Sequence, residues 1–171
     1  MKARTLIDEA RIQRRVEELG AQISADFHGE ELIVLCVLKG GIFFTADLVR
    51  AMSIDVALDF IQVSSYGNEK YSSGVVTILK EPQLDMRGRP VLITEDIIDS
   101  GLSMREVHHY IESRGASRVR VVTLLDKPVS RKVEFRADYV GFTIEPQFVV
   151  GYGLDYAERY RNLREIQVLD D

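Results

Sequence analysis

The feature that most restricts the fold is an apolar run, Leu32–Leu38, in which no polar residue alternates. A strand with one face in water alternates apolar and polar side chains, whereas an uninterrupted run is typical of a strand buried on both faces of a parallel sheet. Two further strand-like runs, Val91–Thr94 and Val119–Leu125, follow, and segments with helical spacing separate them. Because strands and helices alternate along the chain, the sequence predicts an α/β fold with a central parallel sheet flanked by helices.

The segments around these runs complete the predicted order of elements. Asp8 is a good helix cap, and apolar residues recur behind it at helical steps from Ile12 to Ile23, which predicts an amphipathic helix over about residues 8–27. Helices are also predicted at about 41–52 and 103–113, and strands at about 55–64, 75–84, 139–144, 148–150 and 165–169. Since no linker, repeat or low-complexity tract divides the chain, we expect residues 1–171 to form a single domain with a small appendage.

Charge and composition exclude several classes of protein. The 22 Lys and Arg residues against 27 Asp and Glu residues give a formal net charge of −5, which argues against a protein that binds nucleic acid by neutralising phosphates. Cys36, the single cysteine, lies inside an apolar run, so we expect a buried core thiol and no disulfide within the chain. No stretch of 18 consecutive apolar residues occurs, and we expect no membrane partner and a cytoplasmic protein.

The segment between the second buried strand and the next helix carries the residues suited to chemistry. The strand is predicted to end in Glu95 and Asp96, and a short loop, Asp99–Ser103, leads into the helix. The loop supplies a glycine, two hydroxyls and the N–H groups of a helix N-terminus, which suit a phosphate dianion, while the two acids suit sugar hydroxyls or a divalent metal. The set predicts a site for a phosphorylated sugar with Mg²⁺. The alternative is that Asp99 or Ser100 merely caps the helix and the acids are solvated.

The segment Glu95-Asp96-Ile-Ile-Asp99-Ser-Gly101 resembles the signature with which type I phosphoribosyltransferases bind 5-phosphoribosyl 1-diphosphate. Further motifs, arriving in the family's order from about residue 34 to the C-terminus, narrow the resemblance to the hypoxanthine-guanine phosphoribosyltransferases. They are Leu38-Lys39-Gly40-Gly41, Ser65-Tyr66-Gly67, Leu125-Asp126-Lys127, Phe148–Tyr152, Leu154–Tyr156 and Arg161. The resemblance implies the type I phosphoribosyltransferase fold, with a small hood formed by the terminal segments.

The resemblance also implies how the sugar phosphate is held. The acidic pair matches residues that engage the ribose hydroxyls, and the loop after it matches the one that wraps the 5′-phosphate. The phosphoribosyl-binding residues implied in this way are Glu95, Asp96, Asp99, Ser100, Gly101, Leu102 and Ser103. Asp99 also matches the catalytic residue that is proposed to take a proton from N7 of the purine as N9 attacks C1′ of the ribose.

Three residues are implied to bind the purine base. Lys127 resembles the lysine that donates a hydrogen bond to the 6-oxo group, Phe148 matches the aromatic side chain that stacks on the base, and the backbone of Val149 matches the contact to the base edge near C2. Taken alone, a lysine at a strand end is more often solvated, and a Phe-Val-Val run more often belongs to the core.

Other residues are implied to handle the leaving group and the metal. Lys39, Gly40 and Arg161 match pyrophosphate-binding positions. Glu95 and Asp96 with Asp155, which matches a ligand of a second ion, are the implied Mg²⁺ ligands. Ser65 and Tyr66 match the dipeptide of a closing lid. In this family the peptide that matches Leu38–Lys39 can be a cis bond, and the alternative is an ordinary strand-to-helix turn.

These matches imply a purine salvage enzyme that transfers the 5-phosphoribosyl group to hypoxanthine or guanine and acts as a homodimer or homotetramer. Two alternatives stay open. One is a relative that prefers xanthine, and the other is a regulator that binds 5-phosphoribosyl 1-diphosphate without catalysis. Lys127, Phe148 and the negative net charge favour an enzyme over such a regulator. Thr94 departs from the family pattern, in which an apolar residue commonly precedes the acidic pair.

Overall fold

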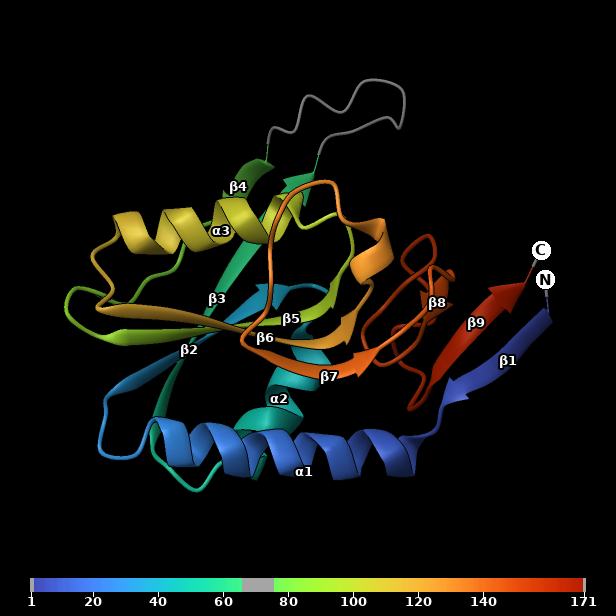
Figure 1. Ribbon diagram of the computed structural model, residues 1–171, viewed down its shortest axis with the longest axis horizontal. Helices are drawn as coiled ribbons and strands as arrows, with labels where there is room; N and C mark the ends of the chain where they lie inside the picture. Colours follow the sequence, from blue (N-terminus) through green and yellow to red (C-terminus); the bar gives the residue numbers. More distant parts are fainter. Residues whose placement is uncertain (1, 66–75, 171) are drawn as a thin grey trace.

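A six-stranded sheet lies at the centre of the computed structural model, which describes residues 2–65 and 76–170 (Figure 1). In the order in which they lie in the sheet, the strands are β4 (Val76–Lys80), β3 (Val56–Ser65), β2 (Leu32–Leu38), β5 (Pro90–Ile98), β6 (Arg118–Asp126) and β7 (Tyr139–Thr143). Neighbours from β3 to β7 are parallel, and the edge strand β4 is antiparallel to β3. The predicted parallel sheet is confirmed, with one antiparallel edge.

Helices cover both faces of this sheet (Figure 1). They are α1 (Glu9–Asp26), α2 (Ile42–Ala51) and α3 (Leu102–Ser113). Leu32 and Val34 of β2 belong to the core cluster under α1 and α2, whereas Ile33 and Leu35 belong to the cluster under α3. Successive side chains of a strand point to opposite faces, so both helical layers are needed to bury the apolar run.

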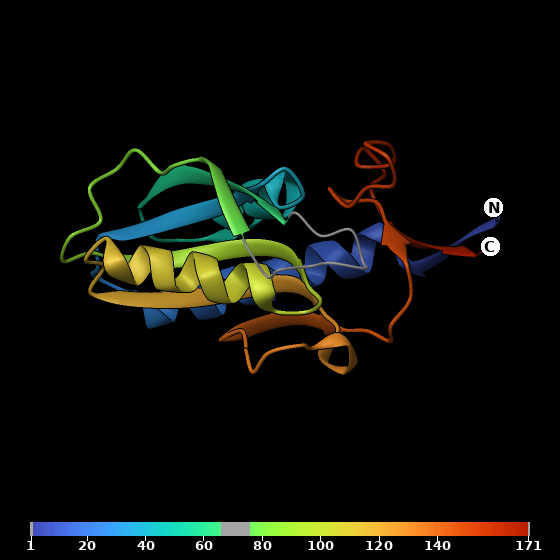
Figure 2. The same cartoon turned by 90° about the horizontal axis from the view of Figure 1, so that it is seen from above.

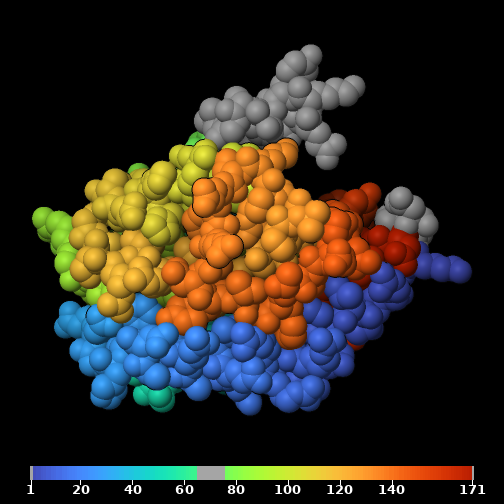
Figure 3. Space-filling model, in the orientation of Figure 1, coloured from blue at the N-terminus to red at the C-terminus, as the bar shows by residue number. Residues whose placement is uncertain are grey.

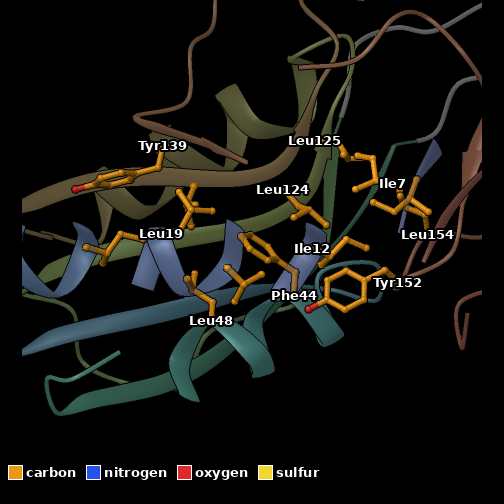
Figure 4. Close-up of a cluster of buried hydrophobic side chains, with 14 of the residues drawn as sticks. Ile7, Ile12, Leu19, Phe44, Leu48, Leu124, Leu125, Tyr139, Tyr152 and Leu154 are labelled. Atoms are coloured by element: carbon orange, nitrogen blue, oxygen red, sulfur yellow. The ribbon is translucent and has the colours of Figure 1, made fainter. Parts of the chain in front are cut away.

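The larger core cluster lies between the sheet, α1 and α2 (Figure 4). Ile12 and Leu19 of α1 pack there with Phe44 and Leu48 of α2, and all four side chains have 0% exposure. The predicted start of the first helix is confirmed, because the carboxylate of Asp8 caps α1 by accepting a backbone N–H. The apolar periodicity thus fixes which face of α1 meets the sheet.

A second, three-stranded sheet forms a hood at one end of the molecule (Figure 2). It consists of β1 (Lys2–Ile7), β9 (Ile166–Asp170) and β8 (Val149–Val150). Strand β9 lies in the middle and is antiparallel to both neighbours, which brings the two ends of the chain side by side. The expected hood of terminal segments is confirmed. Strand β1 was missing from the predicted elements, since it is exposed from Lys2 to Thr5 and lacks a periodic apolar face.

Strand β5 corrects one predicted boundary. It continues beyond Thr94 to Ile98, and Glu95 pairs with Thr123 in the ladder between β5 and β6. The acidic pair, which was predicted to end the strand, therefore lies inside it. Thr94 is fully buried, and its hydroxyl shares a hydrogen bond with that of Thr45 on α2, which compensates the polar group in the core.

The strand predicted over about residues 55–64 ends one residue later than expected, because β3 ends at Ser65, and most of the loop expected at residues 64–74 cannot be compared with the structure. Residues 66–75, which include Tyr66, lie outside the described part of the chain. Among the helices of residues 2–65 and 76–170, none combines the length and the apolar character that crossing a membrane requires.

The order of the strands reverses between β2 and β5. From β2 the chain passes through α2 to β3 on one side, and β5 then returns to the other side of β2. Ligands of open α/β sheets bind at the carboxyl ends of the strands where such a reversal occurs. The residues that follow β2 and β5 share this edge, and Lys127, directly after β6, adjoins it.

Candidate active site

The turn from β5 into α3 forms a small cavity of about 230 Å³ lined by residues between Glu95 and Met104. Gly101 stands at the N-cap of α3 with φ of +83°, a conformation that favours glycine. The Ser100 hydroxyl accepts a hydrogen bond from the N–H of Leu102 at 3.3 Å. Because the first turn of a helix leaves backbone N–H groups without intrahelical partners, the cavity suits an anion.

Asp99 does not cap this helix, so that alternative for Asp99 is wrong. Its side chain is 56% exposed, and its Oδ2 lies 3.7 Å from Nζ of Lys127. Lys127 itself is only 8% exposed, and its N–H donates to the carbonyl of Ile98 at 3.0 Å. A buried ammonium group and an accessible carboxylate thus meet at one point of the sheet edge.

Glu95 and Asp96 lie between the anion cavity and the turn that follows β2. The N–H of Asp96 donates to Oε1 of Glu95 at 3.0 Å. A Cβ atom added at Gly40 would stand 1.9 Å from Oδ2 of Asp96, so this carboxylate reaches the backbone of the turn. Burial, and secondarily the neighbouring carboxylate of Asp96, raise the pKa of Glu95 well above its ordinary range.

The turn after β2 faces a second group of charged residues. The Leu38–Lys39 peptide bond is cis. Nζ of Lys39 lies 3.1 Å from Oε2 of Glu158, and an Nη atom of Arg161 lies 3.2 Å from Oε1 of the same residue. These two cations lower the pKa of Glu158. A cavity of about 770 Å³ lies between this turn, the start of α2 and residues 158–163.

The two Nη atoms of Arg161 contact acceptors, whereas its Nε–H group contacts none among the described residues. One Nη atom donates to the carbonyl of Gly153 at 2.6 Å, and the other lies 3.4 Å from Oδ1 of Asp155. Within the described residues, Nε of Arg161 is buried without a hydrogen-bond partner. A buried, unpaired donor on a cation fits an anion that completes its hydrogen bonding.

Phe148, the residue predicted to stack on the purine, lies next to the hood. Phe148 is 52% exposed, and its ring meets that of Tyr156 edge-on, with 5.8 Å between centroids and 87° between planes. Val149 is buried in β8 and pairs with Val168 of β9. The half-exposed ring of Phe148 leaves part of its surface available for stacking on a planar ligand.

Comparisons with known proteins show which family the chain resembles. A family described as the phosphoribosyl transferase domain matches residues 4–157. The chain is 48% identical over 166 residues to a hypoxanthine-guanine phosphoribosyltransferase of Bacillus subtilis, covering 97% of this chain and 92% of the relative. A relative of the same name from Aquifex aeolicus is 43% identical and is covered to 96%. A crystal structure of the Bacillus anthracis enzyme superimposes with a TM-score of 0.94 at 46% identity and covers 98% of both chains.

The chain belongs to the hypoxanthine-guanine phosphoribosyltransferase family. The resemblance found in the sequence motifs is thereby confirmed, and the chain is a phosphoribosyltransferase with the corresponding α/β fold. The cavity beside Asp99 and the cavity beside Lys39 belong to the same end of the sheet, because Asp96 lines the first and lies against Gly40, the residue after Lys39.

Two residues of this site were not singled out from the sequence. Glu158 connects Lys39 to Arg161, and Arg131 contacts the backbone beside Asp99. No sequence signal marks Glu158, since it lies in a segment of positive backbone angles where helical spacing has no meaning; its own φ is +65°. The position of Arg131, close behind the Leu125-Asp126-Lys127 motif, is the one clue that the chain offers.

The carboxylates of this phosphoribosyltransferase fit Mg²⁺ in part. Glu95 and Asp96 are two oxygen donors with mutual repulsion, which a cation would relieve. Asp155 is already engaged, because it accepts the N–H of Glu158 at 2.9 Å and faces Arg161. No group of three His, Cys, Asp or Glu side chains within residues 2–65 and 76–170 is placed to hold a metal ion. Asp155 was predicted to bind a second ion, apart from Glu95 and Asp96.

The raised pKa of Glu95 predicts a gain in stability for Glu95→Gln in the ligand-free protein. A folded-state pKa above the unfolded value means that the ionised carboxyl opposes folding. We expect the melting temperature of Glu95→Gln to exceed that of the unchanged protein near neutral pH. The difference should shrink as the pH falls toward 4.5, the ordinary pKa of a glutamate, because the native carboxyl is then protonated. Thermal melts measured across this range, with the exposed Glu81→Gln as matched control, test this expectation. A difference that grows on acidification contradicts it.

Proposed function

We propose that this chain transfers the 5-phosphoribosyl group from 5-phosphoribosyl 1-diphosphate to hypoxanthine or guanine. The products are pyrophosphate and the nucleoside 5′-monophosphate, IMP or GMP. The observation that carries the proposal is the meeting of Asp99 and Lys127, 3.7 Å apart, beside the anion cavity at the start of α3. Joining a 6-oxopurine to a sugar phosphate requires a proton acceptor, a hydrogen-bond donor to the 6-oxo group and a site for the phosphate.

The purine is proposed to lie between Lys127 and Phe148. Lys127 donates to the 6-oxo group, Phe148 stacks on the ring, and the Val149 backbone contacts the edge near C2. As N9 forms its bond to C1′, the C1′–oxygen bond to pyrophosphate breaks, and Asp99 takes the proton from N7. The exposure of the Asp99 and Phe148 side chains supports these roles, because both are accessible to an incoming base.

The sugar phosphate is proposed to occupy the β5–α3 turn. Its 5′-phosphate accepts hydrogen bonds from backbone N–H groups and hydroxyls, and the ribose hydroxyls donate to the acidic pair. The residues with these roles are Glu95, Asp96, Asp99, Ser100, Gly101, Leu102 and Ser103. The helix N-terminus and the positive φ of Gly101 support this placement.

Departure of pyrophosphate leaves positive character on C1′, so the protein must stabilise a polyanion next to a developing cation. Lys39, the backbone at Gly40 and Arg161 are proposed to bind the leaving group. The pairing of Lys39 and Arg161 with Glu158 supports this assignment, since all of these side chains gather at one cavity. Glu95 and Asp96 are proposed to hold Mg²⁺ with substrate oxygens, and Asp155 a second ion. Mg²⁺, when bound, would neutralise charge on the diphosphate.

The remaining expectations also belong to this proposal. Ser65 and Tyr66 act as a lid that excludes water from the reacting sugar. The chain works as a single domain, residues 1–171, within a homodimer or homotetramer, resides in the cytoplasm and binds neither nucleic acid nor membrane.

Initial rates with four bases test the proposal. With Mg²⁺ and 5-phosphoribosyl 1-diphosphate, hypoxanthine and guanine should react fastest, and adenine slowest, because the Lys127 ammonium opposes a 6-amino group. Faster turnover of xanthine than of hypoxanthine and guanine would contradict the proposed base specificity. Turnover of adenine at the rate of hypoxanthine would contradict the proposed recognition of the 6-oxo group.

A further inference from the structure

Arg131 lies at the centre of a segment that covers the turn between β5 and α3. The segment follows β6 and begins with the short 3₁₀ helix η1 (Pro128–Ser130). In the space-filling view the orange atoms after β6 lie against the yellow atoms of α3 (Figure 3). The Arg131 side chain is 15% exposed, and its Nη2 lies 2.5 Å from Oδ1 of Asp126, which is equally buried.

The other guanidinium donors of Arg131 bind backbone carbonyls. Nη1 lies 3.1 Å from both the Ile98 and the Asp99 carbonyl oxygens and 3.4 Å from that of Lys127. Nε donates to the carbonyl of Phe135 at 3.0 Å. One side chain therefore holds the end of β5 and the end of β6 in a single hydrogen-bonded unit.

We propose that Arg131 is a positioning residue that sets the distance between Asp99 and Lys127. The inference rests on the proposed function. Asp99 and Lys127 belong to different strand ends, and the backbone carbonyls of both residues meet at the Arg131 guanidinium. Displacing either backbone moves the proton acceptor relative to the donor that fixes the base. Arg131 itself touches no reacting atom.

The guanidinium group is suited to this role in a way that lysine is not. It presents five N–H donors in one plane and retains its charge, whereas an ammonium group has three donors around one nitrogen. In Arg131→Lys the pair with Asp126 can persist, but the ammonium cannot reach the carbonyls on both strand ends at once. The variant therefore keeps the positive charge at this position but loses the hydrogen bonds that connect the two strand ends.

Steady-state kinetics of Arg131→Lys test the proposal, with Arg136→Lys as matched control, because Arg136 is an exposed residue of the same segment. We expect kcat with hypoxanthine to fall about 10- to 10²-fold in Arg131→Lys, the size of effect that small misplacements of reacting groups cause. The KM for 5-phosphoribosyl 1-diphosphate should change little. Melting temperatures ensure that all rates are measured on folded protein, and Arg136→Lys should match the unchanged protein.

A double-mutant cycle with Asp99→Asn separates positioning from general stabilisation. If Arg131 acts through Asp99, Arg131→Lys should lower kcat less in the Asp99→Asn background than in the unchanged chain. Equal losses in both backgrounds, or a lowered melting temperature with unchanged kcat, would overturn the role of Arg131 and leave the proposed function intact. Absence of hypoxanthine turnover in the unchanged protein would instead defeat both.

Discussion

Replacing Asp99 by Asn is expected to lower kcat for hypoxanthine by about 10²- to 10⁴-fold, the usual loss when a general base is removed. Asn keeps the shape of the side chain but cannot take the N7 proton. The affinity for 5-phosphoribosyl 1-diphosphate should change little or rise slightly, since a negative charge near the phosphate is gone. The melting temperature should stay close to that of the unchanged protein, because Asp99 is exposed and Gly101 stands at the helix cap.

Asp85→Asn is the matched control for this variant. Asp85 is also an exposed aspartate in an ion pair, at 2.7 Å from Arg87, but it lies outside the candidate site. Its loss should leave kcat unchanged. If Asp99→Asn lowers the affinity for 5-phosphoribosyl 1-diphosphate as strongly as it lowers kcat, Asp99 positions the substrate and does not transfer the proton.

Replacing Lys127 by Met is expected to lower kcat/KM for hypoxanthine and guanine by about 10- to 10²-fold, the value of one hydrogen bond from a charged donor. Met roughly keeps the volume of the side chain while removing its charge and its donors. The value of kcat/KM for adenine should fall much less, because the ammonium group makes no favourable hydrogen bond to a 6-amino group. The ratio of hypoxanthine to adenine turnover is therefore the quantity to measure.

Lys132→Met provides the comparison for this variant, since Lys132 is an exposed lysine of the segment after β6. Its ratio of hypoxanthine to adenine turnover should equal that of the unchanged protein. An unchanged ratio in Lys127→Met would refute the assignment of Lys127 to the 6-oxo group. The pair with Asp99 would then be its main contact.

Local sequence patterns predicted the helices and strands in which buried apolar residues recur at regular spacing. The run Leu32–Leu38 matches β2 residue for residue, because a doubly buried strand tolerates no polar interruption. The spacing from Ile12 to Ile23 predicted α1 equally well, since one helix face is fully buried. A small cavity lies at Gly101, at the strand-to-helix turn where a glycine and hydroxyls predicted a phosphate site, and this turn is a local feature too.

Features that depend on contacts between distant segments could not be predicted in this way. The end of β5 was placed too early, because Glu95 and Asp96 are polar and their place in the strand depends on pairing with β6. The role of Arg131 depends on carbonyl oxygens contributed by another strand end, at Ile98 and Asp99. Periodicity within a segment carries no information on such partners.

The most direct measurement of the proposed activity is the stoichiometry of products formed by the unchanged protein. With Mg²⁺, 5-phosphoribosyl 1-diphosphate and hypoxanthine, we predict equal amounts of pyrophosphate and IMP, and no pyrophosphate when the base is left out. Binding of 5-phosphoribosyl 1-diphosphate without any product, or release of pyrophosphate that does not depend on a base, would contradict the proposal that the chain joins a purine to the phosphoribosyl group.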